Sequence, residues 1–411
     1  MDPLTSRSST SPPGELGPGL YVHVPFCTRR CGYCDFSIVV GAPRGRDAFV
    51  HDVLTEADLH LADADGANSF GSDRFATLSL GGGTPSLLST EELTALFGGL
   101  RSRFPFVDAP EISLECNPES LEPEKIEALL ASGVTRFSIG VQSLDPAELA
   151  LLDRAHQPEQ VATLFRTLRA AGARDVSLDL IFGLPGQSLA TWTTTVENAI
   201  ALAPDHVSAY LLTLEGKAPL LKRLPGGARA LPPEELVAEQ YALLQERLSA
   251  AGLEQYEVSN FARAGHESRH NANYWMRGDY LALGPAAHAH RSGRRWSNAI
   301  FPKWRARLAA GELPIESVEA LTPQEVVEES IFLPLRTRWG IGWDQLAGML
   351  TAEQVERLRG KAEELGAAGF VDVGERLRLR AGAYLISNAI FSELLGVIGE
   401  EGNWVTQGVT Q

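Results

Sequence analysis

Three cysteines lie close together near the start of the chain, in Cys27-Thr28-Arg29-Arg30-Cys31-Gly32-Tyr33-Cys34. Three thiolates at this spacing on one loop can bind three irons of a 4Fe–4S cluster, which leaves the fourth iron open to a substrate. The alternatives are a disulfide, a zinc site or ordinary buried thiols. A chain with four cysteines and no export signal disfavours a disulfide. Zinc usually needs a fourth ligand, whereas Cys116 is distant in the sequence. The spacing therefore predicts a cluster on Cys27, Cys31 and Cys34, with Cys116 a small buried residue.

A run of glycines, Gly81-Gly82-Gly83-Thr84, follows the second strand that we expect. Glycine lacks a Cβ, so its backbone can approach a ligand closely and can adopt positive φ. On its own such a run often marks only a turn. Together with the cysteine triad it predicts a ligand-binding loop beside the cluster.

The composition limits the classes of partner and compartment. The formal net charge of −16 argues against nucleic acid, because phosphate binding requires clustered Lys and Arg. No segment approaches the roughly 18 apolar residues of a membrane span. The N-terminal residues are rich in Ser, Pro and Gly and lack the apolar stretch of a signal peptide. We expect residues 1–19 to be a disordered tail and the protein to be cytoplasmic, where thiols stay reduced.

Short β-type runs alternate with amphipathic segments from Leu20 to about Leu214, a pattern typical of βαβ units and a parallel sheet. The expected strands are Leu20–Val24, Thr77–Leu80, Glu111–Glu115, Arg136–Ile139, Val176–Ile181 and Val207–Leu212. The expected helices between them are Ala48–Asp63, Glu91–Arg101, Pro123–Ala131, Glu159–Ala171 and Leu189–Ala201. Six units predict an α/β fold, an incomplete (β/α)6 TIM-like barrel over residues 20–311 with its closing segment. The cysteine loop, the glycine run, Glu115, Gln142 and Asp179 fall at strand ends, where such barrels carry function.

The C-terminal part has a different pattern. A helix is expected over Glu234–Gly252 and a linker over Leu313–Pro323. Helical patterns then precede two short runs at Phe370–Val373 and Leu377–Arg380, which predicts a winged-helix-like module over residues 323–411. This module lacks a basic face, so a structural or lid role is favoured over DNA binding.

Several motifs resemble those of one protein superfamily. The triad followed by Gly81-Gly82-Gly83-Thr84-Pro85 resembles the radical S-adenosylmethionine (SAM) superfamily. Further segments resemble its oxygen-independent coproporphyrinogen III oxidase group: Tyr21-Val22-His23-Val24-Pro25-Phe26-Cys27, Glu115-Cys116-Asn117-Pro118, Ser138-Ile139-Gly140-Val141-Gln142-Ser143 and Asp179-Leu180-Ile181-Phe182-Gly183-Leu184-Pro185-Gly186. Within that group, Tyr256-Glu257-Val258-Ser259-Asn260 and His270-Asn271-Ala272-Asn273-Tyr274-Trp275 resemble the HemW family of heme chaperones. Phe36 stands where the oxidases carry a fourth cysteine, which favours the chaperones.

The resemblance implies roles for particular residues. SAM would chelate the open iron, and the glycine run with Thr84 would contact its methionine part. Five residues match SAM-contacting positions of the oxidases: Tyr21, Glu115, Gln142, Arg154 and Asp179. Tyr33 and Ile181 would line the same site. An internal salt-bridge network is the alternative for the three charged residues. The oxidases bind a second SAM, and the sequence leaves the number bound by this chain open.

His270 is the residue through which the sequence suggests heme binding. Imidazole can ligate heme iron, and Tyr274 and Trp275 are spaced to lie beside a porphyrin. The alternative is that this polar stretch only closes the barrel; His156, His288 and His290 are weaker candidates. The resemblance implies a chaperone that passes heme to apo-proteins, possible acceptors being respiratory enzymes at the membrane. The alternatives are an oxygen-independent coproporphyrinogen III oxidase and a radical SAM enzyme with another substrate. A homodimer through the cysteine loop is one oligomeric state that the sequence allows.

Overall fold

The computed structural model describes residues 17–41, 45–63, 69–70, 73–214, 218–224 and 227–399. Most of the expected N-terminal tail therefore lies outside the described residues, and the first strand begins at Gly19.

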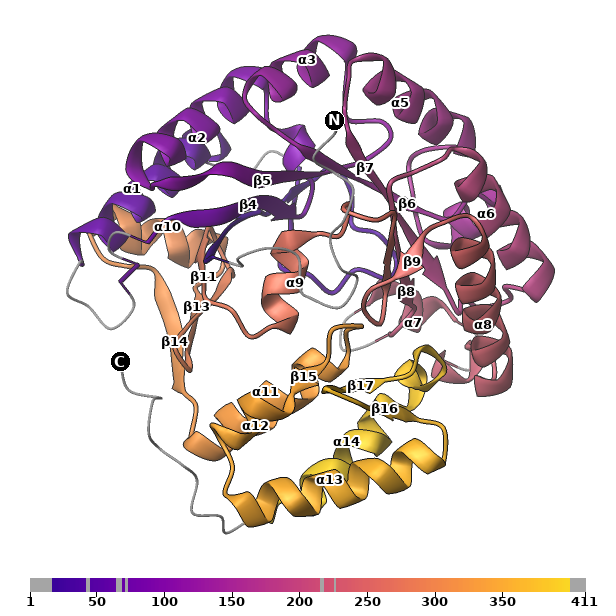
Figure 1. The fold of residues 1–411 in the computed structure, drawn as a ribbon. Coiled ribbons are helices and arrows are strands. Elements are labelled where there is room, and N and C mark those ends of the chain that lie inside the picture. Colours follow the sequence, from indigo (N-terminus) through magenta and orange to yellow (C-terminus); the bar gives the residue numbers. More distant parts are fainter. Residues whose placement is uncertain are drawn as a thin grey trace, which may run out of the picture.

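Six parallel strands form the curved centre of the molecule (Figure 1). Neighbours pair in the order β1 (Gly19–Val24), β4 (Phe75–Gly82), β5 (Phe106–Cys116), β6 (Arg136–Gln142), β7 (Asp175–Phe182) and β8 (His206–Leu211). Helices cover the convex side: α1 (Phe49–Ala62), α2 (Thr90–Arg103), α3 (Pro123–Ala131), α5 (Pro158–Ala170), α6 (Leu189–Ala201) and α8 (Glu234–Ala250). All six expected strands are present, so the prediction of an incomplete α/β barrel is confirmed.

Apolar side chains explain why these strands bury their outer face. Leu78 and Leu80 on β4 are fully buried, as are Leu20 and Val22 on β1. Strands covered by helices need this apolar character, because the helices exclude water from that face. The alternate positions point into the barrel and are free to carry polar groups.

Further strands extend the sheet at both edges. Beside β1 lie β11 (Tyr280–Leu283), β12 (His288–Arg291), β13 (Arg294–Asn298) and β14 (Ile315–Ala320); beside β8 lie β10 (Asn260–Ala262) and β9 (Glu254–Gln255). The expected linker over Leu313–Pro323 is wrong, because β14 pairs antiparallel with β13. The sheet of the barrel therefore continues to Ala320. Buried and exposed residues do not alternate clearly in this edge strand, which is why its sequence resembles a linker.

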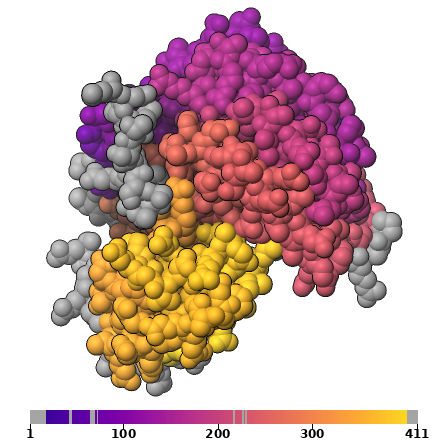
Figure 2. All heavy atoms as spheres, turned by 45° about the vertical axis from the view of Figure 1, so that its right-hand side comes forward, coloured from indigo at the N-terminus to yellow at the C-terminus, as the bar shows by residue number. Residues whose placement is uncertain are grey.

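The C-terminal residues form a separate layer of helices at the open side of the barrel, orange and yellow in Figures 1 and 2. They comprise α11 (Pro323–Leu335), β15 (Ile341–Gly342), α12 (Trp343–Ala347), α13 (Ala352–Ala367), β16 (Val371–Val373), β17 (Arg376–Leu379) and α14 (Ser387–Gly396). Buried Trp339 packs against Tyr256 of the barrel, with ring centroids 5.8 Å apart, and the backbone N–H of Arg338 donates to the Tyr256 carbonyl at 2.9 Å. None of the helices in the described part of the chain has the length and apolar character needed to cross a membrane.

Candidate functional site

The cysteine loop is fixed at both ends by short strands. It leaves β2 (Phe26–Cys27) and returns through β3 (Val39–Val40), which pairs with β2 in parallel. The N–H of Gly32 donates to the Leu152 carbonyl at 3.0 Å, and the Gly32 carbonyl accepts from the N–H of Leu220 at 2.7 Å. These bonds hold the loop against the mouth of the barrel.

One cavity at the carboxyl ends of the strands brings the predicted residues together. It is lined by all three clustered cysteines and by Tyr33, Gly82, Gly83, Thr84, Glu115, Gln142, Arg154 and Asp179. Here it is called the cluster cavity. The other predicted site residues, Tyr21, Ile181 and His270, are not on its lining, and Ile181 is buried. Residues up to 152 positions apart, from Cys27 to Asp179, thus share one space, as expected for the carboxyl edge of a parallel sheet.

The three sulfurs suit a cluster better than the alternatives. Cys27, Cys31 and Cys34 are free thiols that share the cavity lining. Burial raises the pKa of Cys27 to about 11, so an incoming metal must displace a proton. Arg154 Nη1 donates to Cys31 Sγ at 3.5 Å and supplies a positive charge beside a thiolate. Cys116 also borders this cavity, but its side chain is buried in the core and its thiol donates to the Ser138 carbonyl at 3.4 Å.

The glycine run is packed against the protein itself. A Cβ on Gly81 would lie 2.6 Å from Glu115 Oε1, and one on Gly82, whose φ is +109°, would lie 2.6 Å from the His23 ring. A Cβ on Gly83 would lie 2.7 Å from the Phe26 carbonyl oxygen. These close approaches let β4 end directly against the cysteine loop and Glu115. A side chain at Gly83 would therefore displace the cysteine loop as well as any ligand.

Arg154 and Gln142 place polar atoms at the far wall. Arg154 Nη2 donates to the Gly140 carbonyl at 2.6 Å and to Asn117 Oδ1 at 2.7 Å, while its buried Nε has no partner among the described residues. Gln142 has φ of +67°, at a register shift between β6 and β7. A non-glycine residue held at positive φ stores backbone strain of about 1–3 kcal/mol, which is common at binding sites. A free guanidinium N–H fits a carboxylate such as that of SAM.

Two carboxylates face each other across the cavity floor. Burial, and secondly the charge of Asp179, raises the pKa of Glu115 to about 7, while the Gly82 N–H donates to Glu115 Oε2 at 3.2 Å and opposes the shift. Burial also raises the pKa of Asp179, although Ser138 Oγ donates to it at 2.9 Å. The exposed side chain of Glu115 lies on the lining of this cavity. Arg154 favours ionised Asp179, whereas no cation of the described residues does so for Glu115, as expected of a carboxylate that awaits a positively charged ligand.

A second cavity adjoins the first and shares Phe36, Gly82 and Glu115 with it. The other lining residues come from β1, the cysteine loop, helices α9 (Arg269–Trp275) and α11, and the edge strands β11–β13 with their connections: Tyr21, His23, Ser37, Tyr274, Arg277, Gly278, Tyr280, Ala286, Ala287, His288, His290, Arg295 and Leu333. The sequence singled out only Tyr21, Tyr274 and two histidines here. Arg277 and Tyr280, three and six residues after Tyr274, were missed because no motif marks them.

His270 lies at the opposite end of the barrel from the cysteine loop. Its Nδ1 is 2.6 Å from Thr77 Oγ1, and its Nε2 is 2.7 Å from the Tyr274 hydroxyl. Thr77 and Gly82 are five residues apart on β4, a distance of about 16 Å along a strand. His270 is not on the lining of the second cavity, but it contacts two residues that are: Tyr274, and Tyr21, on which its ring stacks with centroids 6.3 Å apart. Heme ligation by His270 stays a prediction, and in this arrangement the hydrogen bond at the ligating ring nitrogen would have to break.

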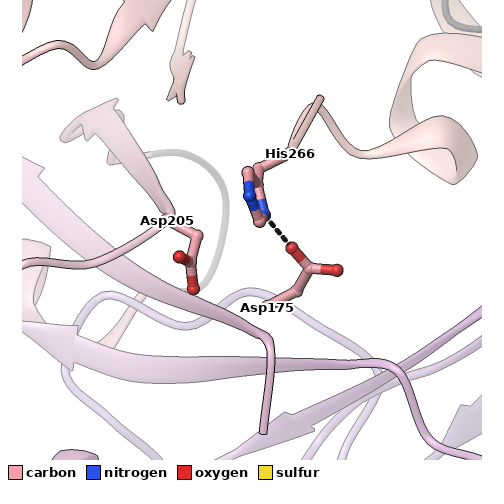
Figure 3. A group of neighbouring side chains, drawn as sticks. All are labelled: Asp175, Asp205 and His266. Carbon is pink, nitrogen blue, oxygen red and sulfur yellow. Dashed lines mark hydrogen bonds and ion pairs between the residues drawn. The ribbon is translucent and has the colours of Figure 1, made fainter. Parts of the chain in front are cut away.

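Three side chains of metal-ligand type meet at the amino ends of β7 and β8, away from both cavities (Figure 3). His266 Nδ1 hydrogen bonds to Asp175, and Asp205 accepts from Arg169 Nη2 at 2.6 Å. Arg136 contributes a further nearby positive charge that favours ionised Asp175. Because both carboxylates already face cations, we interpret these three side chains as an ion-pair network at the amino ends of the strands, the end of such barrels that serves stability.

This network predicts a pH dependence of stability. The hydrogen bond to Asp175 raises the pKa of His266, whereas Asp175, with a lowered pKa, is ionised above pH 6 in both folded and unfolded chains. The stabilisation is therefore complete below the ordinary histidine pKa and is lost as pH rises through the raised value. Because the pair is partly exposed, we expect at most about 1 kcal/mol. Urea titrations at pH 6 and 8 should show that the free energy of unfolding falls with pH in the wild type and not in His266→Gln. An equal change between the two pH values in both proteins would refute the prediction.

Comparison with known proteins identifies relatives along most of the chain. The family model for the Radical SAM superfamily matches residues 21–199. A heme chaperone HemW of Mycobacterium tuberculosis is 39% identical over 92% of this chain and 95% of its own length. HemW of Bacillus subtilis is 33% identical over 92% of this chain and 98% of its own length.

A solved structure has the same fold. Coproporphyrinogen III oxidase (HemN) from Escherichia coli covers 92% of this chain and 90% of its own, with a TM-score of 0.78 at 22% identity. The likeness to HemN concerns the fold, whereas the identity to HemW extends over nearly the whole sequence. The chain therefore belongs to the HemW family of the Radical SAM superfamily.

Proposed function

We propose that this protein is a heme chaperone, which binds a 4Fe–4S cluster, SAM and heme and delivers the heme to acceptor proteins. The observation that carries the proposal is the identity of 39%, over 92% of the chain, to a relative named heme chaperone. The cluster would be held by Cys27, Cys31 and Cys34, whose sulfurs share one cavity.

SAM would occupy the remainder of the cluster cavity. Arg154 would bind its carboxylate through N–H groups, and the carboxylates of Glu115 and Asp179 would bind its ammonium and ribose groups. Gly82, Gly83, Thr84, Gln142 and Tyr33 complete this lining, while Tyr21 stands behind Glu115 in the adjoining cavity. A reduced cluster with SAM supplies radical chemistry when both are bound.

Phe36 separates this proposal from the oxidase alternative. It occupies the position of the oxidases' fourth cysteine, is 60% exposed and lines both cavities. An exposed phenylalanine offers an apolar contact to a flat ring or a protein surface rather than a metal ligand. The oxidase fold, with a TM-score of 0.78, keeps coproporphyrinogen oxidation as the second candidate.

The proposal extends to partners and to the C-terminal region. Acceptors would be apo-proteins such as respiratory enzymes, met in the cytoplasm or at the membrane surface. A homodimer would form through the exposed cysteine loop, where Phe36 and Val40 are 60% and 49% exposed. Residues 323–411 would act as a winged-helix-like module that covers the open side of the barrel.

An anaerobic turnover assay separates the two candidates. Reconstituted protein is incubated with coproporphyrinogen III, SAM and a reductant, and the tetrapyrroles are quantified. We expect no protoporphyrinogen above a control without SAM, because the fourth cysteine is replaced. Sustained multiple turnovers by the wild type would overturn the chaperone proposal in favour of the oxidase.

A further inference from the structure

The second cavity has the composition of a site for a flat, anionic ligand. Three tyrosines, Tyr21, Tyr274 and Tyr280, contribute aromatic rings, and Tyr274 and Tyr280 pack edge to face with centroids 4.6 Å apart. Arg277, Arg295 and Glu115 are its charged side chains besides the histidines. Mostly apolar walls with a few convergent polar groups are typical of cofactor pockets.

Three histidines line this cavity, and two of them are already hydrogen bonded at both ring nitrogens. His23 contacts the Ser37 carbonyl through Nε2 at 3.2 Å and the Tyr21 hydroxyl through Nδ1 at 3.3 Å. His290 Nδ1 lies 3.2 Å from the Gly278 carbonyl, and its Nε2 accepts from the Gly293 N–H at 3.3 Å. His288 is exposed, and neither of its ring nitrogens hydrogen bonds to a described residue. It is the free imidazole of this cavity.

The register of the strands places positive charge near that imidazole. His288 and His290 are alternate residues of β12 and share one face of it, roughly 7 Å apart along the strand. Arg295 of β13 lies directly opposite His290. Arg277 and Arg295 also contact Glu329 of α11, so the C-terminal layer holds them in place.

We infer that the second cavity is the heme site, with His288 as the iron ligand and Arg295 and Arg277 facing the propionates. This inference rests on the proposed heme-binding function and assigns its residues. Heme has its iron at the centre and its carboxylates on one edge. A free imidazole on β12, two residues from the position that faces Arg295 on β13, reproduces that arrangement. His270 becomes a positioning residue that fixes the Tyr274 hydroxyl at the cavity wall.

Titrations with heme and with metal-free protoporphyrin IX separate the iron ligand from the other contacts. In His288→Ala, heme affinity should fall at least roughly tenfold, the scale on which even outer partners of a metal site act. The Soret band should shift as well, and protoporphyrin affinity should stay unchanged. His51→Ala, at an exposed histidine of α1, is the matched control. An unchanged Soret band and affinity in His288→Ala, with heme still bound by the wild type, would overturn the inference and leave the proposed function standing.

A second pair of variants tests the propionate contact. Arg295→Gln should weaken heme and protoporphyrin alike, by roughly threefold or more. Glu319→Gln removes an exposed partner of Arg295 at 3.8 Å outside the cavity and should have no such effect. Equal protoporphyrin affinity in both variants would contradict the arginine assignment. Absence of heme binding to the wild type would instead contradict the proposed function.

Discussion

Replacing Cys27, Cys31 and Cys34 together by Ala should reduce the iron and sulfide content of the reconstituted protein to background. These three cysteines lie on one loop at the cavity, whereas the fourth cysteine on its lining, Cys116, is buried and bonded to the Ser138 carbonyl. The brown chromophore should disappear, whereas the circular dichroism spectrum should stay that of the wild type, because the loop is attached to the barrel by backbone hydrogen bonds. Iron analysis and the visible spectrum measure the result.

Cys116→Ala is the matched control for the cysteine replacement. Its thiol is buried and bonded to the Ser138 carbonyl, so the variant should keep a full cluster and lose only a little stability. If Cys116→Ala lost the cluster as completely as the triple variant does, the assignment of an open iron would be wrong.

Replacing Glu115 by Gln should weaken SAM binding by roughly ten- to a hundredfold. The carboxylate lies in the barrel mouth without a cationic partner in the described structure, its hydrogen bond coming from the Gly82 N–H. A hydrogen bond between charged groups contributes about 1.5–3 kcal/mol, and 1.4 kcal/mol corresponds to tenfold. Equilibrium dialysis of the cluster-loaded protein measures the affinity. Glu124→Gln, at an exposed carboxylate of α3 that lines neither cavity, should bind SAM normally.

The pH dependence of SAM binding gives a second readout of Glu115. Its pKa, raised by burial to about 7, means that the carboxylate is largely neutral at pH 6 and largely ionised at pH 8. Since the ionised form attracts the ammonium, affinity should rise between these pH values. Asp179, Tyr21 and His23 also border this space and can contribute to the pH dependence. The part of the change in SAM affinity with pH that disappears in Glu115→Gln therefore reports on Glu115. Identical slopes in wild type and variant would exclude this role.

The site was more predictable than its surroundings, for physical reasons. Parallel strands bring their carboxyl ends to one edge, so Glu115, Gln142 and Asp179 could be placed together from their positions at strand ends. His270 could not, because its motif lies on a helix that turns back to the amino end of β4, beside Thr77. Sequence spacing carries no information on such a return of the chain.

The second cavity illustrates the same limit. Its walls combine β1, α9, the edge strands and α11, elements that meet only after the sheet is extended beyond β11. The strand β14 belongs to that extension, and its exposed, poorly alternating residues predicted a linker instead. Which of the nine histidines keeps a free ring nitrogen depends on neighbours such as Ser37 and Gly293, and only the folded structure supplies them.

A heme titration of the cluster-loaded wild type tests the central claim most directly. The visible absorbance spectrum would be recorded after each addition of heme, and the same additions to buffer would be subtracted to remove the contribution of free heme. The heme-chaperone account predicts saturable binding with a Soret band distinct from that of free heme. The spectrum of the cluster should persist, because none of the three cluster cysteines lines the heme site. Absence of saturable heme binding by a protein that retains its cluster and binds SAM would contradict the account.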